Sequence, residues 1–255
     1  MPLNTALSRR TALGSVISLG ASAGFAMRPA AALAPAQFRD RLRGPILSVP
    51  TVFDARFEVD SSGIRRVIET GLKGGCGAVA LTSGNSQYDR LTYDEIKELT
   101  RTVIHAVAGR ALTIAATGPW WTGQAADYAR FAESLGADAV QVMLPPYGND
   151  DTLFEHFRTV AAATRCAIVL HGQVPPALLE RLMQIESIVA YKEEYTMLYS
   201  VDVFAHYARR LNIFCRRAEC ALSDVPAVRH AGLLQHVVHL RSRAGAAFLG
   251  GRSCR

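Results

Sequence analysis

Lysine is scarce in this chain of 255 residues, which contains 25 arginines but only three lysines. Two of these, Lys73 and Lys97, fall in segments of helical periodicity, where the charged end of a lysine is usually solvated. The third, Lys192, closes the apolar run from Ile188 to Tyr191 and is therefore expected at the end of a buried strand. A lysine kept there indicates that a primary amine is required, although a structural lysine paired with one of the two glutamates that follow has the same spacing.

Cysteine pairs with metal-binding or redox spacing are also missing. None of the five cysteines belongs to a CxxC motif, and Cys76, Cys166 and Cys215 lie far apart, in or beside apolar runs. Cysteines in such settings are usually buried free thiols. We therefore expect neither a metal site nor a bound cofactor.

A basic patch on the body of the protein is not evident, despite the formal net charge of +6. Residues 1–34 hold three arginines and no acidic residue, and residues 216–255 hold seven arginines against two acidic residues. Residues 35–215 hold 18 basic and 20 acidic residues. Because nucleic-acid binders place basic side chains on the folded body, where they neutralise phosphates, we do not expect a nucleic acid as partner.

The apolar stretch near the N-terminus is too short and too diluted with glycine and serine to span a bilayer stably. It follows Ser8-Arg9-Arg10-Thr11 and precedes Ala32-Leu33-Ala34, a small-x-small pattern suited to signal peptidase. This arrangement resembles a twin-arginine export signal, with a membrane helix or a frayed amphipathic start as the alternatives. Residues 1–34 are therefore predicted to be a signal peptide of a periplasmic or otherwise exported protein without a stable membrane anchor.

From Gly44 onward, short apolar runs alternate with longer segments of helical period, as in repeated βα units around a parallel sheet. The expected strands are Ile46 to Phe53, Ala78 to Thr82, Leu112 to Ala116, Ala139 to Leu144, Ala167 to His171, Ile188 to Lys192 and Asn212 to Cys215. The expected helices lie near Ser61 to Lys73, Thr92 to Val107, Gly123 to Leu135, Thr152 to Thr164, Pro176 to Met183 and Met197 to Leu211.

The glycine-rich phosphate loop that a doubly wound sheet usually carries after its first strand is missing, and Pro50 to Ala55 follow instead. This favours an α/β fold of the (β/α)8 TIM-barrel type over residues 35–215. The helix and strand that should complete its last two units are not visible after Cys215, so the barrel is expected to be incomplete after strand seven. Residues 216–255 form an atypical Arg-rich tail.

Active groups in such a barrel project from the carboxyl ends of the strands and from the loops that follow them. The residues expected there are Thr51, Thr82, Ser83, Gly84, Trp120, Trp121, Tyr147, His171 and Lys192. Partial burial at a strand end lowers the pKa of a lysine and leaves a neutral amine that can attack a carbonyl carbon. Lys192 is therefore a candidate for an imine-forming nucleophile.

The other groups at these strand ends each have two interpretations. The turn Thr82-Ser83-Gly84 offers donors suited to a small carboxylate, but such residues also make plain connections. Tyr147 and His171 are candidates for moving protons, whereas a lone histidine near an apolar strand is often a core residue. Trp120 and Trp121 either roof a substrate or cover the barrel mouth.

Together, these residues resemble the dihydrodipicolinate synthase and N-acetylneuraminate lyase family, from residue 44 to about residue 215. The matching segments are Pro50 to Asp54, Leu81 to Ser86 where the family has GTTGES, Pro145 to Tyr147, and Ile188 to Glu193. The last segment matches a family pattern like IVGIKD, whose lysine forms the Schiff base. This correspondence implies the same role for Lys192.

The resemblance implies a carbon–carbon or carbon–oxygen lyase of the class I aldolase type that acts on pyruvate or a related 2-keto acid. Lys192 would attack the keto carbon, and Thr82 and Ser83 would hold the carboxylate, with Thr51 and Gly84 as further substrate-binding candidates. Cleavage, condensation or dehydration would follow, with the protonated imine as the electron sink. Family members are often tetramers, so a complete barrel would be expected to form a homo-oligomer.

Three departures from the family pattern argue against dihydrodipicolinate synthesis itself. His171 stands where the family has a proton-shuttling tyrosine, and Asn85 replaces the glutamate of GTTGES. The arginine that often follows strand five and binds a second carboxylate has no counterpart before Arg181.

The tail is a fourth departure. Codons permitted for Asp224 to Ala244, read one base later, can spell ordinary barrel sequence with a Pro-Tyr-Gly turn, which favours a frameshift near residues 216–223. A truncated barrel has unpaired strand edges. An inactive or unstable family member, with at most a ligand-binding role, is therefore the alternative to an active enzyme.

Overall fold

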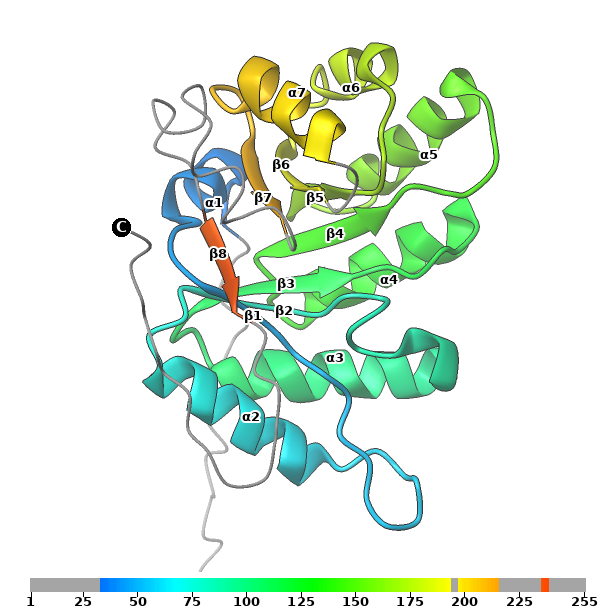
Figure 1. The fold of residues 1–255 in the computed structure, drawn as a ribbon. Coiled ribbons are helices and arrows are strands. Elements are labelled where there is room, and N and C mark those ends of the chain that lie inside the picture. Colours follow the sequence, from blue (N-terminus) through cyan, green and yellow to red (C-terminus); the bar gives the residue numbers. More distant parts are fainter. Residues whose placement is uncertain (1–32, 194–196, 216–234, 239–255) are drawn as a thin grey trace, which may run out of the picture.

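The sheet of this protein consists of parallel strands whose order along the sheet follows their order in the sequence. The computed structural model describes residues 33–193, 197–215 and 235–238 (Figure 1). The strands are β1 (Ile46–Ser48), β2 (Ala78–Ala80), β3 (Leu112–Ala116), β4 (Ala139–Met143), β5 (Ala167–His171), β6 (Ile188–Glu193), β7 (Asn212–Cys215) and β8 (Gln235–Val238). This strand order is that of a barrel, so the predicted TIM-type architecture is confirmed.

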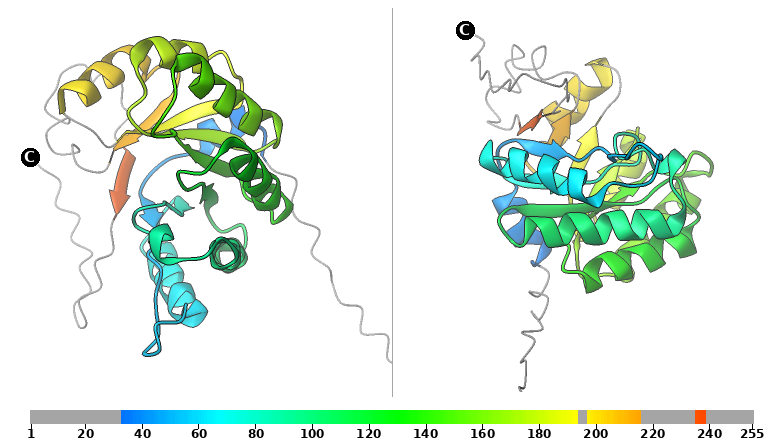
Figure 2. Two further views of the ribbon diagram at one scale, coloured as in Figure 1. Left: turned by 90° about the vertical axis from the view of Figure 1, so that its right-hand side faces the viewer. Right: turned by 90° about the horizontal axis from the view of Figure 1, so that it is seen from below.

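Helices follow each of the first six strands and cover the outer face of the curled sheet (Figure 2). They are α2 (Ser61–Lys73), α3 (Tyr93–Val107), α4 (Thr122–Ser134), α5 (Asp150–Ala162), α6 (Pro176–Leu182) and α7 (Met197–Tyr207). Each lies close to its expected range. A further short helix, α1 (Pro35–Arg41), precedes β1 and was not predicted.

Beyond β7, the described residues supply only a short strand of the barrel, so the barrel is incomplete there, as expected. In the described part of the chain, neither β7 nor β8 is followed by a helix. The four-residue strand β8 was not predicted, and it joins β7 and β1 through two residue pairs on each side. The predicted export signal lies outside the described residues except for Leu33 and Ala34, and so does the Arg-rich tail except for β8. Within the described ranges, no helix is both long and apolar enough to cross a bilayer.

Side chains alternate between the two faces of each strand and thereby form two apolar layers. The outer layer lies between the sheet and the helices, and Leu170 and Tyr191 belong to it. The inner layer fills the barrel and consists of Phe38, Leu42, Ile46, Ala78, Ala80, Leu112, Ile114, Ala139, Ala167, Val169, Val189, Ala190 and Phe214. Because Phe38 and Leu42 come from α1 and the residue after it, this helix is part of the barrel core.

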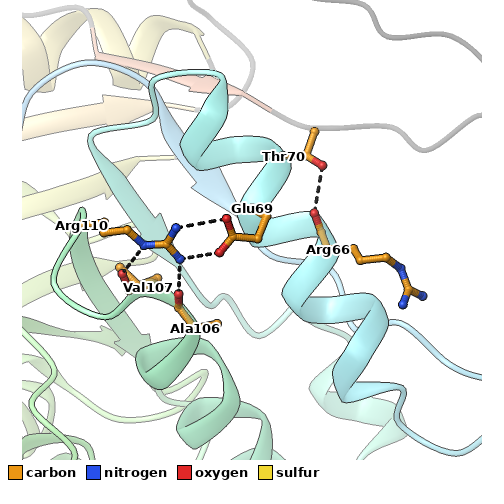
Figure 3. Close-up of polar contacts among 6 residues, drawn as sticks. All are labelled: Arg66, Glu69, Thr70, Ala106, Val107 and Arg110. Atoms are coloured by element: carbon orange, nitrogen blue, oxygen red, sulfur yellow. Dashed lines mark hydrogen bonds and ion pairs between the residues drawn. The ribbon is translucent and has the colours of Figure 1, made fainter.

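The C-terminal end of α3 is fastened to α2 by Arg110 (Figure 3). Its guanidinium group donates to the Glu69 carboxylate, at 3.0 Å for the Nη1–Oε2 pair, and to the carbonyl oxygens of Ala106 and Val107. The hydrogen bond from Arg110 lowers the pKa of Glu69. Two carbonyl groups at a helix end, where the helix itself supplies few partners, are thereby satisfied. At the other end of α3, Thr92 and Glu95 form a capping box.

Helices α4 and α5 share a buried histidine. His156 is 4% exposed, and its Nδ1 atom lies 3.0 Å from Thr122 Oγ1. Among the described residues, its Nε2 atom has no hydrogen-bond partner. Burial lowers the pKa of His156 from 6.5 to about 4, because the charged imidazolium is poorly solvated there.

This histidine is expected to weaken the fold in acid. Its pKa is lower in the folded than in the unfolded chain, so the stability gained from the neutral form is present above pH 6.5 and is lost as the pH falls toward 4. At 1.36 kcal/mol per pH unit, the loss reaches about 3 kcal/mol. Urea unfolding of wild type and His156→Gln at pH 7 and pH 4 measures it. Between pH 7 and pH 4, the free energy of unfolding of the wild type should fall by about 3 kcal/mol more than that of the variant. An equal fall in both would contradict a lowered pKa of His156 as the cause.

Candidate functional site at the carboxyl end of the barrel

Lys192 projects into the barrel from the end of β6. Its neighbour Ala190 belongs to the inner layer, and residues two apart on a strand face the same side. Tyr191 faces the outer layer instead. The lysine is only 7% exposed, so the structure places a buried primary amine where the sequence analysis expected one.

His171 ends β5 and stands directly beside Lys192. The two residues are register partners on adjacent parallel strands. Such partners lie about 4.8 Å apart and point to the same face of the sheet. His171 is 6% exposed, and Val169, two residues earlier, belongs to the inner layer. The structure therefore brings the predicted imidazole and amine together inside the barrel.

A shift in register makes this pairing. Ile168 pairs with Ile188, but Val169 pairs with Ala190, so Val189 is passed over. Without this bulge, Val169 would pair with Val189, and His171 would stand beside Tyr191. The extra residue turns Lys192 to the same side as His171.

Gln141 is a member of this cluster that the sequence analysis did not identify. It lies on the inner face of β4, is 1% exposed, and places its Nε2 atom 3.3 Å from His171 Nδ1. Its Oε1 atom has no hydrogen-bond partner in the described part of the chain. A polar residue at an inward position of the apolar strand Ala139–Met143 was the signal that could have revealed it.

The predicted carboxylate-binding turn follows β2. Thr82 is 4% exposed, Ser83 is half-buried and Gly84 is exposed. Thr82 Oγ1 accepts a hydrogen bond from the Asn85 backbone N–H at 3.2 Å, and Thr82 N–H donates to Ser86 Oγ at 3.1 Å. These bonds hold the turn in one conformation.

The loop after β1 fastens this turn from the other side. The Thr51 hydroxyl donates to the Ser86 carbonyl at 2.5 Å, and the Asn85 side chain donates to the carbonyl and hydroxyl oxygens of Ser48, each at 3.0 Å. The Ser86 hydroxyl donates to the Val49 carbonyl at 2.7 Å. Thr51 and Asn85 thus have structural partners that position the turn.

Tyr147 is not brought into the cluster within this chain. It lies in the loop between β4 and α5, and its side chain is 87% exposed. Trp121 is likewise 72% exposed. Trp120 packs edge-on against Tyr128, with ring centroids 5.1 Å apart, which makes it part of the cover around the barrel.

The backbone after His171 is fixed by phenol groups. Tyr191 donates to the Gly172 carbonyl and accepts from the Val174 N–H at 3.2 Å. Tyr199 donates to the Val174 carbonyl. Burial raises the pKa of Tyr191 well above its usual value, so its phenol remains a neutral donor. The strand end that carries His171 is therefore held rigidly.

The sequence of residues 41–232 matches the dihydrodipicolinate synthetase family. The chain belongs to this family. Members of the family are lyases of the class I aldolase type, and the match continues past β7 into the segment expected to be an atypical tail.

Two curated relatives illustrate the range of the family. The chain is 31% identical over 150 residues to a 4-hydroxy-tetrahydrodipicolinate synthase of Desulforudis audaxviator, covering 55% of this chain and 51% of the relative. It is 34% identical over 171 residues to a probable 5-dehydro-4-deoxyglucarate dehydratase of Streptomyces avermitilis, covering 62% and 51%. The chain thus spans about half the length of these relatives.

Solved structures agree on the fold. The dihydrodipicolinate synthase of Aquifex aeolicus superposes with a TM-score of 0.66 at 24% identity, covering 76% of this chain and 69% of that chain. The N-acetylneuraminate lyase of Mycoplasma synoviae gives 0.67 at 17% identity, covering 78% and 69%. At these identities, the likeness establishes the barrel fold alone.

Gly172 provides a test of how the end of β5 is held. Its φ of 131° is unfavourable for residues with a side chain, and an added Cβ would lie 2.7 Å from Leu144 Cβ. Gly172→Ala should therefore lower the free energy of unfolding by about 2–3 kcal/mol in urea titrations. Gly109 has a φ of 73° but open space around it, so Gly109→Ala is the matched control and should lose only about 1 kcal/mol. Equal losses in both variants would contradict the packing of this turn.

Proposed function

We propose that this protein is a Schiff-base-forming lyase or aldolase that acts on pyruvate or a related 2-keto acid through an imine at Lys192. The observation that carries the proposal is the buried lysine at the carboxyl end of β6, in register with His171 on β5. A buried amine loses its solvation and becomes a better nucleophile when it is neutral.

In the proposed reaction, Lys192 Nζ attacks the keto carbon, and the carbinolamine then takes up a proton from solvent and loses water to give a protonated imine. The iminium group accepts the electron pair of the bond that is broken on the carbon next to the former keto carbon, and an enamine results. Thr82 and Ser83 bind the carboxylate. Thr82 Oγ1 already accepts a hydrogen bond from Asn85 N–H, which leaves its own proton to be donated to a carboxylate oxygen.

The proposed substrate class is that of the 2-keto acids. The relatives include a probable 5-dehydro-4-deoxyglucarate dehydratase as well as synthases. Asn85, with its amide bound to Ser48, and His171 stand at positions where the family resemblance has glutamate and tyrosine. These changes favour a 2-keto acid other than the substrate of dihydrodipicolinate synthesis.

A second candidate is an inactive family member with at most a ligand-binding role. It is favoured by the short β8 strand, which holds β7 and β1 through only two residue pairs each, because a weakly closed sheet lowers stability. We further propose that residues 1–34 direct export, which cell fractionation would test, and that a fully formed barrel assembles with copies of itself.

Trapping with borohydride separates the two candidates. Incubation with pyruvate and sodium borohydride should add one reduced pyruvate to the wild-type protein, on the peptide that contains Lys192, as read by mass spectrometry. Lys192→Arg should abolish the adduct, whereas Lys97→Arg, on α3 and ion-paired with Asp94, is the matched control and should retain it. A folded wild-type protein without an adduct would favour the inactive candidate.

A further inference from the structure

Gln141 lowers the stability of the fold at its buried position. It lies inside the barrel, 1% exposed, and its Oε1 atom lacks a hydrogen-bond partner among the described residues. An unpaired buried oxygen of this kind costs about 1–3 kcal/mol. The preceding inward position on the same strand, Ala139, is apolar. An apolar residue at position 141 would therefore favour stability, so a role other than packing accounts for the glutamine.

In the described part of the chain, the side chain of Gln141 has its polar contact with the histidine of the cluster. Gln141 Nε2 lies 3.3 Å from His171 Nδ1. A carboxamide nitrogen can only donate, so Nδ1 must accept, and the single proton of a neutral imidazole must then be on Nε2. The opposite orientation of the amide would leave two N–H donors unpaired, whereas this orientation leaves one N–H donor and Oε1. Buried N–H groups without a partner are rarer than such oxygens, so this orientation is favoured.

We propose that Gln141 is a positioning residue that fixes His171 as the neutral tautomer with its proton on Nε2. Protonation of Nδ1 would set two donors against each other, so the glutamine also opposes formation of the imidazolium. The Nε2–H bond lies on the opposite edge of the ring and points away from Gln141.

The chemical consequence rests on the function proposed above. A neutral imidazole that presents an N–H is a hydrogen-bond donor to a substrate oxygen and stabilises negative charge that develops on that atom. It is a poor proton acceptor, because its acceptor nitrogen is already occupied by the amide. The histidine would thus polarise the 2-keto acid bound to Lys192, and the base that removes a proton would be another group or water.

The tautomer can be measured without turnover. Long-range proton–nitrogen correlation spectra of protein labelled with ¹⁵N-histidine distinguish Nδ1–H from Nε2–H, and His171→Asn assigns the signal. Wild type should show His171 protonated on Nε2. Gln141→Glu places an acceptor beside Nδ1, so it should move the proton to Nδ1 and shift the titration of His171 upward by about one to two pH units. A wild-type His171 protonated on Nδ1 would overturn the proposal.

A matched control lies in the same barrel interior. Asn212 donates to the Arg39 carbonyl at 2.6 Å, at the end of the barrel that α1 closes. Asn212→Asp makes the same change from amide to acid, and it should leave the tautomer of His171 as in wild type. If Gln141→Glu does not fold, the neutral Gln141→Met serves instead and should yield a mixture of tautomers. An unchanged Nε2–H signal in that variant would contradict a positioning role.

A kinetic measurement tests whether the tautomer of His171 matters for the reaction. It also distinguishes failure of the Gln141 proposal from failure of the proposed imine at Lys192. Exchange of pyruvate methyl protons in deuterated water, followed by proton NMR, should fall about 10- to 100-fold in Gln141→Met, a loss typical of a misplaced catalytic group. Borohydride should still trap pyruvate on Lys192 in this variant. Normal exchange in the variant would remove Gln141 from the mechanism, whereas failed trapping in wild type would remove the imine and leave the tautomer result intact.

Discussion

A one-residue shift in register between β5 and β6 determines which side chains share the interior of this barrel. Val169 pairs with Ala190, and Val189 is passed over. Since neighbours in a parallel sheet point to the same side, Lys192 meets His171 there, while Tyr191 turns outward. The remaining features of the site depend on this arrangement: Gln141 contacts the imidazole from β4, and Tyr191 holds the backbone that follows His171.

The polar cluster of Gln141, His171 and Lys192 lies toward one end of the barrel, because apolar side chains fill most of the other end. Phe38 and Leu42 close the amino-terminal side against small inner residues such as Ala78 and Ala167. At the carboxyl side, the same inner positions carry Gln141, His171 and Lys192. Loop hydrogen bonds from Thr51 and Asn85 then hold the turn after β2 at this end. These contacts fix the surroundings of the polar side chains, as a preorganised site requires.

Much of this organisation could be predicted from the sequence, because the period of the apolar residues changes from strand to helix in each unit. The same pattern placed His171 and Lys192 at strand ends, since each closes an apolar run. The bulge could not be predicted, because register depends on packing between strands. The role of α1 was hidden for a similar reason: seven residues show too little periodicity to reveal a helix that packs into the barrel. Strand β8 could not be predicted, because the Arg-rich residues 216–255 do not show the alternation of apolar strands and helical segments found in the earlier units.

The most direct test of this account is a crystal structure of the protein after treatment with pyruvate and borohydride. The account predicts continuous density from Lys192 Nζ to the former keto carbon, the carboxylate at the turn of Thr82 and Ser83, and the imidazole of His171 on the same side as the adduct. An adduct on another amine, or a His171 ring beside Tyr191 on the outer face, would contradict it.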